Sequence, residues 1–179
     1  MATSGTVAFR PTIEEIIDEA FERCGIDTQT RTGGQSRSAR RSLNMLFSEW
    51  SNRGWNYWTV GYKTVTLVAG QATYTLDAGL VDIIDVVYRN VSGSTSTDQV
   101  MNRVAISEYN QIPNKTDSGV SSQYMIDRQY TPTMTVWQVP DNTSDSIRYY
   151  GVFQPEDVTA SNQDADIPYR WTDALCAGL

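Results

Sequence analysis

The first third of the chain places apolar side chains at helical spacing. One stripe consists of Ile13, Ile16, Ile17, Ala20, Phe21 and Cys24. Thr12 and Glu15 have the spacing of a capping box, and Gly25 follows where helices commonly end, so we expect a helix between them. A second stripe, over residues 36–53, comprises Ala39, Leu43, Leu46, Phe47 and Trp50. Two helices with one apolar stripe each predict an N-terminal helical hairpin over residues 1–58.

The apolar period changes to two after Trp58, which indicates β-strands. Candidate strands cover residues 62–68, 72–76, 81–89, 99–104, 123–129, 133–139 and 146–153. Short strands separated by turn sequences are typical of an antiparallel β-sandwich or open barrel, which we expect over residues 59–153. Residues 90–99 are rich in Ser and Thr and predict a mobile loop tip between two strands.

The C-terminal part, residues 154–179, begins with a polar connector and ends in a short apolar stripe at helical spacing. Asp166 can cap a helix and Pro168 suits its first turn. The apolar stripe that follows consists of Trp171, Ala174, Leu175 and Leu179. Such a stripe must be buried, either by returning to the N-terminal hairpin or by docking on another chain. The predicted fold class is therefore α+β, with a C-terminal helix or extension.

Charge is distributed unevenly along the chain. The net charge is −7, and residues 61–179 carry all of it. An acidic surface of this kind does not bind a phosphate backbone, although it could line a channel through which DNA passes. Arg37, Arg40 and Arg41 gather at the start of the second helix, the unfavourable end for cations. These three arginines are either solvated or meet acidic groups on a neighbouring subunit.

Catalytic chemistry has little support in the residues. The chain has no histidine, which excludes histidine-activated nucleophiles and histidine metal sites, and it has no nucleotide-binding or hydrolase motif. The remaining candidates for acid–base work are Glu156 with Asp157, and Glu108, which are more often solvated carboxylates. We expect no catalytic residue, cofactor or metal, and we expect Cys24 and Cys176 to be buried as small apolar residues. No signal-like or membrane-spanning segment is present, so a cytosol-like compartment or an assembly is expected.

Aromatic side chains cluster where the helical pattern gives way to strands. Trp50, Trp55, Tyr57 and Trp58 are best interpreted as a core plug that joins the two layers. The alternative is an exposed stacking platform for a sugar or a base.

A series of segments in a fixed order gives the clearest indication of function. They read IIDEAFERCGI, SARRSLNMLFSEWSNRGWNYWTV, YTLDAGLVDIIDVVYR, SEYNQIPNK, YMIDRQYTPTMTVWQVPD and RWTDALCAGL. This series spans residues 11–179 and resembles the head-to-tail adaptor family of tailed bacteriophages. Members of that family are also called packaged-DNA stabilisation or head-completion proteins.

The resemblance implies a structural, non-enzymatic virion protein that is assembled in the host cytoplasm. Its expected form is a twelve-subunit ring below the portal protein, with tail or nozzle protein on the other side and DNA passing through the channel. It also implies that the C-terminal segment docks on the portal and that the docking helix is longer than the one ending at Leu179. The matching residues are Tyr169, Arg170, Trp171, Ala174, Leu175 and Leu179.

Two further possibilities stay open at the level of sequence. Residues Ser92, Ser94, Thr95 and Ser96 could form a loop that faces the tail. A carbohydrate-binding β-sandwich and a carboxylate-based peptidoglycan hydrolase are the alternative functions, and the second needs a pair of poised carboxylates.

Overall fold

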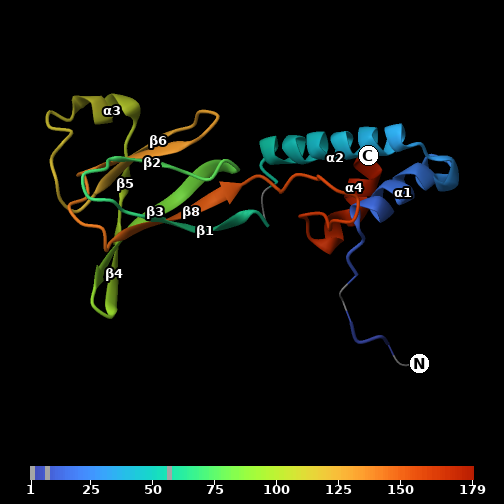
Figure 1. Ribbon diagram of the computed structural model, residues 1–179, viewed down its shortest axis with the longest axis horizontal. Coiled ribbons are helices and arrows are strands. Elements are labelled where there is room, and N and C mark those ends of the chain that lie inside the picture. Colours follow the sequence, from blue (N-terminus) through green and yellow to red (C-terminus); the bar gives the residue numbers. More distant parts are fainter. Residues whose placement is uncertain (1–2, 7–8, 56–57) are drawn as a thin grey trace. The chain divides into compact units, whose positions relative to one another are not determined.

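The computed structural model describes residues 3–6, 9–55 and 58–179, and it divides into two compact units. The helical unit contains Met1–Trp58 and Gln154–Leu179, and the β unit contains Thr59–Phe153 (Figure 1). The chain thus enters and leaves the β unit through the helical unit. The division into segments 1–58, 59–153 and 154–179 stays a prediction, because contacts alone do not establish which segments fold independently.

Helix α1 (Ile13–Arg23) forms as its sequence predicts. The Thr12 hydroxyl accepts a hydrogen bond from the Glu15 backbone N–H at 3.3 Å. The Glu15 carboxylate in turn accepts from the Thr12 backbone N–H at 2.7 Å. The capping box is therefore complete, and Gly25 follows the helix with a φ of +74°, a conformation that glycine adopts without strain.

Helix α2 (Gly33–Asn52) starts earlier than its apolar stripe indicates. A second capping box causes this, because Thr32 accepts from the Gln35 backbone N–H at 3.3 Å and Gln35 accepts from Thr32 at 2.8 Å. The first turn consequently includes Gly33 and Gly34, two residues of low helix propensity. Between α1 and α2 lies a short 3₁₀ turn, η1 (Thr28–Thr30).

The C-terminal helix starts later than expected. A 3₁₀ turn, η2 (Tyr169–Trp171), precedes helix α4 (Thr172–Gly178). Asp166 does not cap either of them; its carboxylate instead accepts a hydrogen bond from the Glu156 backbone N–H at 3.0 Å. The expectation of a helix capped by Asp166 was wrong because this carboxylate ties the two ends of the connector together.

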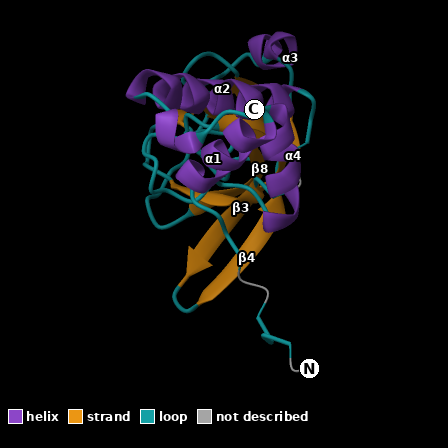
Figure 2. Cartoon of the chain, turned by 90° about the vertical axis from the view of Figure 1, so that its right-hand side faces the viewer, coloured by secondary structure: helices purple, strands orange, loops and turns teal. Residues whose placement is uncertain are grey.

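The connector of residues 154–166 belongs to the core of the helical unit. Val158 is buried, and its backbone N–H and carbonyl both hydrogen-bond the Asn44 side chain, at 2.8 and 3.3 Å. The Ile13 backbone N–H donates to the Gln163 carbonyl at 2.8 Å, which joins the connector to the start of α1. Figure 2 shows α1 and α4 together beneath α2. The shared core contains Ile13, Ile16, Ile17, Ala39, Leu43, Phe47, Trp50, Val158, Leu175 and Cys176.

The β unit consists of two four-stranded sheets and a short helix. The first sheet has the order β1 (Val60–Thr66), β8 (Ser146–Phe153), β3 (Leu80–Ser92), β4 (Thr95–Val100). The second has the order β2 (Thr73–Thr75), β7 (Thr133–Trp137), β6 (Gln123–Asp127), β5 (Asn102–Arg103), and helix α3 (Ile106–Gln111) follows β5. All pairs are antiparallel except β5 with β6, which is parallel, so the second sheet is mixed rather than antiparallel throughout.

Side chains from both sheets build one core between them. Along β8, Ile147 and Tyr149 are buried and their neighbours Arg148 and Tyr150 are only half-buried, the alternation of a strand with one inner face. The core contains Leu67, Tyr74, Leu76, Ile83, Val86, Tyr88, Met101, Tyr124, Met134, Val136, Ile147 and Tyr149. The predicted α+β fold, with open sheets packed as a sandwich, is confirmed.

The Ser- and Thr-rich tip is mostly paired strand, which corrects the expectation of a loop over residues 90–99. Strand β3 continues to Ser92, and β4 starts at Thr95, so only Gly93 and Ser94 form the turn. Gly93 has a φ of +61° while Ser94 does not have a positive φ, as in a type II′ hairpin turn. The β3–β4 hairpin extends away from the rest of its sheet (Figure 1), and we call its outer part, residues 90–97, the finger.

Candidate functional site

The predicted docking segment lies mostly on the helical unit's own core. Leu175 is fully buried, and Trp171 and Leu179 are half-buried against the same core. Of the two alternatives, the structure has the helix returning to its own helices. Leu175 is therefore not available to a partner in this conformation. The other predicted docking residues, Tyr169, Arg170 and Ala174, are exposed.

Three tryptophans pack around Trp171. Its ring centroid lies 5.8 Å from that of Trp50, 6.0 Å from Trp55 and 5.3 Å from Trp58. The Trp58 indole N–H donates to the Asp166 carbonyl at 2.9 Å. Trp50 is buried and Trp58 and Trp171 pack against the core, whereas Trp55 is 37% exposed, so most of this cluster is core packing within the helical unit rather than an open stacking platform. Tyr57 lies outside the described residues.

The three arginines of α2 have no acidic partner within the described part of the chain. Arg40 donates to the Thr159 carbonyl at 3.3 Å, and Arg41 donates to the Ser38 hydroxyl at 3.1 Å. Arg37 and Arg41 are exposed and Arg40 is half-buried. Their role in contacts between subunits stays a prediction.

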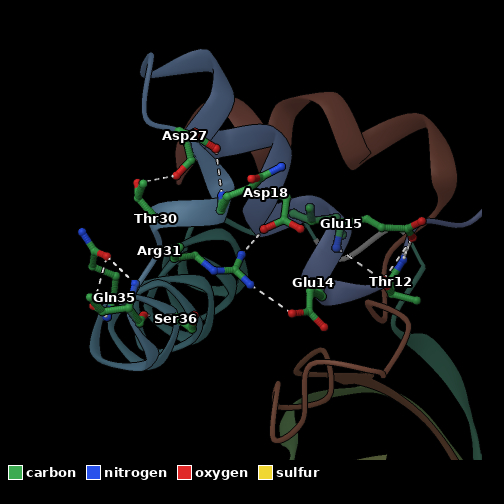
Figure 3. A network of polar contacts seen from close by, with 12 residues as sticks. Thr12, Glu14, Glu15, Asp18, Asp27, Thr30, Arg31, Gln35 and Ser36 are labelled. Carbon is green, nitrogen blue, oxygen red and sulfur yellow. Dashed lines mark hydrogen bonds and ion pairs between the residues drawn. The ribbon is translucent and has the colours of Figure 1, made fainter.

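A different arginine, Arg31, forms ion pairs with two carboxylates of α1. Its guanidinium contacts the carboxylates of Glu14, at 3.0 Å, and Asp18 (Figure 3). Little of the Arg31 side chain is exposed, so this residue ties the α1–α2 connection to α1. Sequence reasoning missed Arg31, because its polar surroundings carried no apolar period to mark a contact.

A hollow of about 440 Å³ opens between α1 and α4. Its lining includes Glu15, Glu19, Asp173 and Tyr169. Arg23 forms ion pairs with Glu19 at 2.7 Å and Asp173 at 2.8 Å, and these hydrogen bonds raise the pKa of Arg23. One guanidinium against three carboxylates leaves the hollow acidic. We call this place the α1–α4 hollow; its remaining lining residues are Phe9, Pro11, Ile16, Thr172 and Cys176.

A buried carboxylate anchors the base of the finger. Asp145, which is 1% exposed, accepts hydrogen bonds from the Tyr88 hydroxyl at 2.6 Å and the Val91 backbone N–H at 2.8 Å. The side-chain amides of Asn90 and Asn142 also donate to it, at 3.2 and 2.9 Å. The loop before β8 thereby holds β3 at the point where the finger leaves the sheet.

Burial and hydrogen bonding act in opposite directions on this carboxylate. Burial disfavours the charged form, but the donors from Tyr88, Val91, Asn142 and Asn90 favour it and hold the pKa of Asp145 below its ordinary value. Burial and the adjacent carboxylate raise the pKa of Tyr88. Asp145 is thus ionised and Tyr88 neutral at neutral pH, which keeps the donor and acceptor matched. No pattern in the sequence distinguished Asp145 from the other acidic residues.

The predicted tail-facing residues lie on the finger. Ser92, Ser94, Thr95 and Ser96 are all exposed, three of them in strands and Ser94 in the turn. Farther down the hairpin, Arg89 and Asp98 face each other across β3 and β4 with two hydrogen bonds of 2.7 Å. This bidentate pair fixes the register below the exposed end of the finger.

The carboxylates that the sequence offered for acid–base catalysis are either hydrogen-bonded at a helix start or exposed. Glu108 accepts a hydrogen bond from the Ala105 backbone N–H at 2.8 Å, at the start of α3, and Glu156 and Asp157 are exposed. Within residues 3–6, 9–55 and 58–179, no group of three or more Cys, Asp or Glu could hold a metal ion. In the same part of the chain, no helix is long and apolar enough to span a membrane.

The two cysteines differ in exposure. Cys176 is buried, which raises its pKa, but Cys24 is exposed at the end of α1, so its expected burial was wrong.

Exposed arginines, an acidic hollow and a protruding finger are surfaces suited to binding other proteins. The comparison with protein families identifies the class directly, because the model of the SU10 adaptor protein family matches residues 11–179. The chain belongs to this family, and the resemblance to phage head-to-tail adaptors is confirmed. It is therefore a bacteriophage adaptor protein. The comparison with curated proteins returned no match.

Proposed function

We propose that this chain is a non-enzymatic virion protein that forms a ring below the portal, closes the DNA-filled head and connects it to the tail or nozzle. The observation that carries this proposal is the family match over residues 11–179. The ring of twelve subunits and the assembly in the host cytoplasm follow from the resemblance to head-to-tail adaptors.

Portal docking would use the exposed part of the C-terminal segment. Tyr169 is 60% exposed, and Arg170 and Ala174 are exposed beside it. Tyrosine and arginine are the residue types that most often dominate binding energy at protein interfaces. We therefore assign Tyr169 as the anchor of the portal contact. Leu175 and Trp171 pack in the core and fix the position of the 3₁₀ turn that carries Tyr169.

Tail contact and DNA passage would fall to the β unit. The finger would present four exposed hydroxyl side chains to a tail protein: Ser92, Ser94, Thr95 and Ser96. The net charge of −7 in residues 61–179 supports a channel wall that DNA passes without sequence-specific binding.

Native mass spectrometry of the chain mixed with the portal ring of the same virus tests the proposal. Twelve added copies per portal ring are expected, and no added copy from a folded sample would overturn portal docking. Deleting the last helix is an unsuitable test, because it removes Leu175 from the core. A variant combining Tyr169→Ala and Arg170→Ala should lose binding while keeping its fold.

Tyr130→Ala provides the control, because Tyr130 is fully exposed in the β unit and its loss removes an exposed tyrosine outside the predicted docking segment. This control should bind the portal like the wild type. Equal portal binding by the Tyr169 and Arg170 variant would refute the assignment of these residues but not the ring.

A further inference from the structure

Helix α2 carries a row of exposed side chains on the face opposite the core of the helical unit, next to the connector residues Gln154, Pro155 and Asp157. Leu43 and Phe47 are buried toward α1 and α4, whereas Arg37, Arg41 and Met45 recur every four residues on the opposite side. Met45 is 64% exposed, a large fraction for an apolar side chain. We call Arg37, Arg41 and Met45 the α2 stripe.

The α1–α4 hollow is the electrostatic complement of this stripe. On α1, Glu15 and Glu19 are four residues apart, the same spacing as Arg37 and Arg41 on α2, so both pairs rise about 6 Å along their helices. Both carboxylates are exposed, and Asp173 adds a third. The single Arg23 guanidinium pairs with Glu19 and Asp173, so carboxylates remain in excess in the hollow. Phe9, which lines the same hollow and is 75% exposed, offers an apolar contact for a side chain such as methionine.

The stripe and the hollow cannot meet within one molecule. The residues of α2 that pack on α1 and α4 lie on the helix face opposite the stripe, and Figures 1 and 2 both show α1 and α4 on one side of α2. Two complementary surfaces on different sides of one unit join copies head to tail, an arrangement that gives a closed ring when the rotation between neighbouring copies closes.

We propose that the α2 stripe of one copy docks in the α1–α4 hollow of a second copy, with the Arg41 and Arg37 guanidinium groups meeting Glu15 and Glu19. This inference rests on the proposed ring and names its lateral contact. Tyr169 lines the hollow and is also the assigned portal anchor, so the test leaves it unchanged.

A charge exchange tests the contact. Arg41→Glu places like charges opposite each other, and so does Glu19→Arg. Each variant alone should need a concentration about tenfold higher or more for ring assembly on the portal, measured by native mass spectrometry. An equimolar mixture of the two should recover assembly, because each reversed surface then meets an opposite charge.

Lys63→Glu and Asp77→Lys are the matched controls, since they reverse charges at an exposed ion pair of the β unit, outside both surfaces. Both controls should assemble like the wild type. Normal rings from Arg41→Glu, or a mixture that stays as impaired as each variant alone, would overturn the contact and leave the ring proposal standing.

A cross-link separates failure of the contact from failure of the ring. Arg41→Lys keeps the charge and introduces an amine that a carbodiimide joins to a neighbouring carboxylate. A covalent dimer linking position 41 to Glu15, Glu19 or Asp173 supports the contact even if wild-type rings do not form on the portal. Absence of that link at high protein concentration overturns it.

Discussion

Leu175 tests whether the C-terminal helix is part of the protein's own core. The side chain is fully buried in the helical unit, together with Ile13, Ile16 and Leu43. Leu175→Ala removes three carbon atoms, which at about 0.8 kcal/mol each amounts to roughly 2 kcal/mol of lost burial. The cavity left behind raises the expected loss in free energy of unfolding to about 3 kcal/mol.

Tryptophan fluorescence during urea unfolding reports mainly on the helical unit, where Leu175 lies. Trp50, Trp55, Trp58 and Trp171 belong to the helical unit, and Trp137 is the fifth tryptophan of the chain. A loss of about 3 kcal/mol should lower the urea midpoint by roughly 1 to 3 M.

The neighbouring residue supplies the control for this experiment. Ala174 is exposed on the same helix, so Ala174→Ser should change the free energy of unfolding by about 0.5 kcal/mol or less. If Leu175→Ala changes stability as little as Ala174→Ser and instead abolishes portal binding, the helix is buried by its partner and the reasoning from the core is wrong.

Four further predictions concern single contacts. Asp145→Ala should lower the free energy of unfolding of the β unit by about 3 to 5 kcal/mol, measured by urea unfolding followed by circular dichroism, because buried donors lose their acceptor. The pKa of Asp145 is lower in the folded state, so its stabilisation is full above about pH 4 and lost below, and the variant's stability should depend less on pH in that acidic range. The pKa of Tyr88 is raised instead, so its stabilisation is present below about pH 10 and lost above it, and Tyr88→Phe should flatten the fall of stability at alkaline pH. Gly93→Ala should cost about 1 kcal/mol at the positive φ and speed hydrogen exchange in β4 while the rest of the β unit exchanges unchanged. Arg31→Ala should cost about 1 kcal/mol at low salt, and a loss that does not shrink at high salt would contradict its electrostatic origin.

Local signals in the sequence predicted the elements better than their ends. The Thr12–Glu15 capping box fixed the start of α1, because all of its contacts lie within one turn. The same box at Thr32 and Gln35 was overlooked, since Gly33 and Gly34 between them argue for a loop by propensity alone. A satisfied helix end outweighed two unfavourable residues, so the cap was the stronger signal.

Contacts between distant segments could not be read from the sequence. The tryptophan cluster near Trp55 was visible as a local run, but its central member, Trp171, comes from the other end of the chain. Asp145 resembled any loop carboxylate until the fold brought Tyr88 and Val91 to it. In both cases the sequence showed the residue but not its partners, because those partners are brought together only by the tertiary fold.

The burial of Leu175 changes the kind of interface that this adaptor can offer to a portal. An apolar helical stripe would have bound as a helix in a groove, with its energy spread over several aliphatic side chains. With Leu175 and Trp171 already packed, the exposed residues are a tyrosine and an arginine in a 3₁₀ turn, supported from below by the core. A rigid aromatic side chain loses little conformational entropy on binding, so a few such groups can supply most of the affinity. Portal affinity should therefore depend on Tyr169 far more than on the length of the helix that follows it.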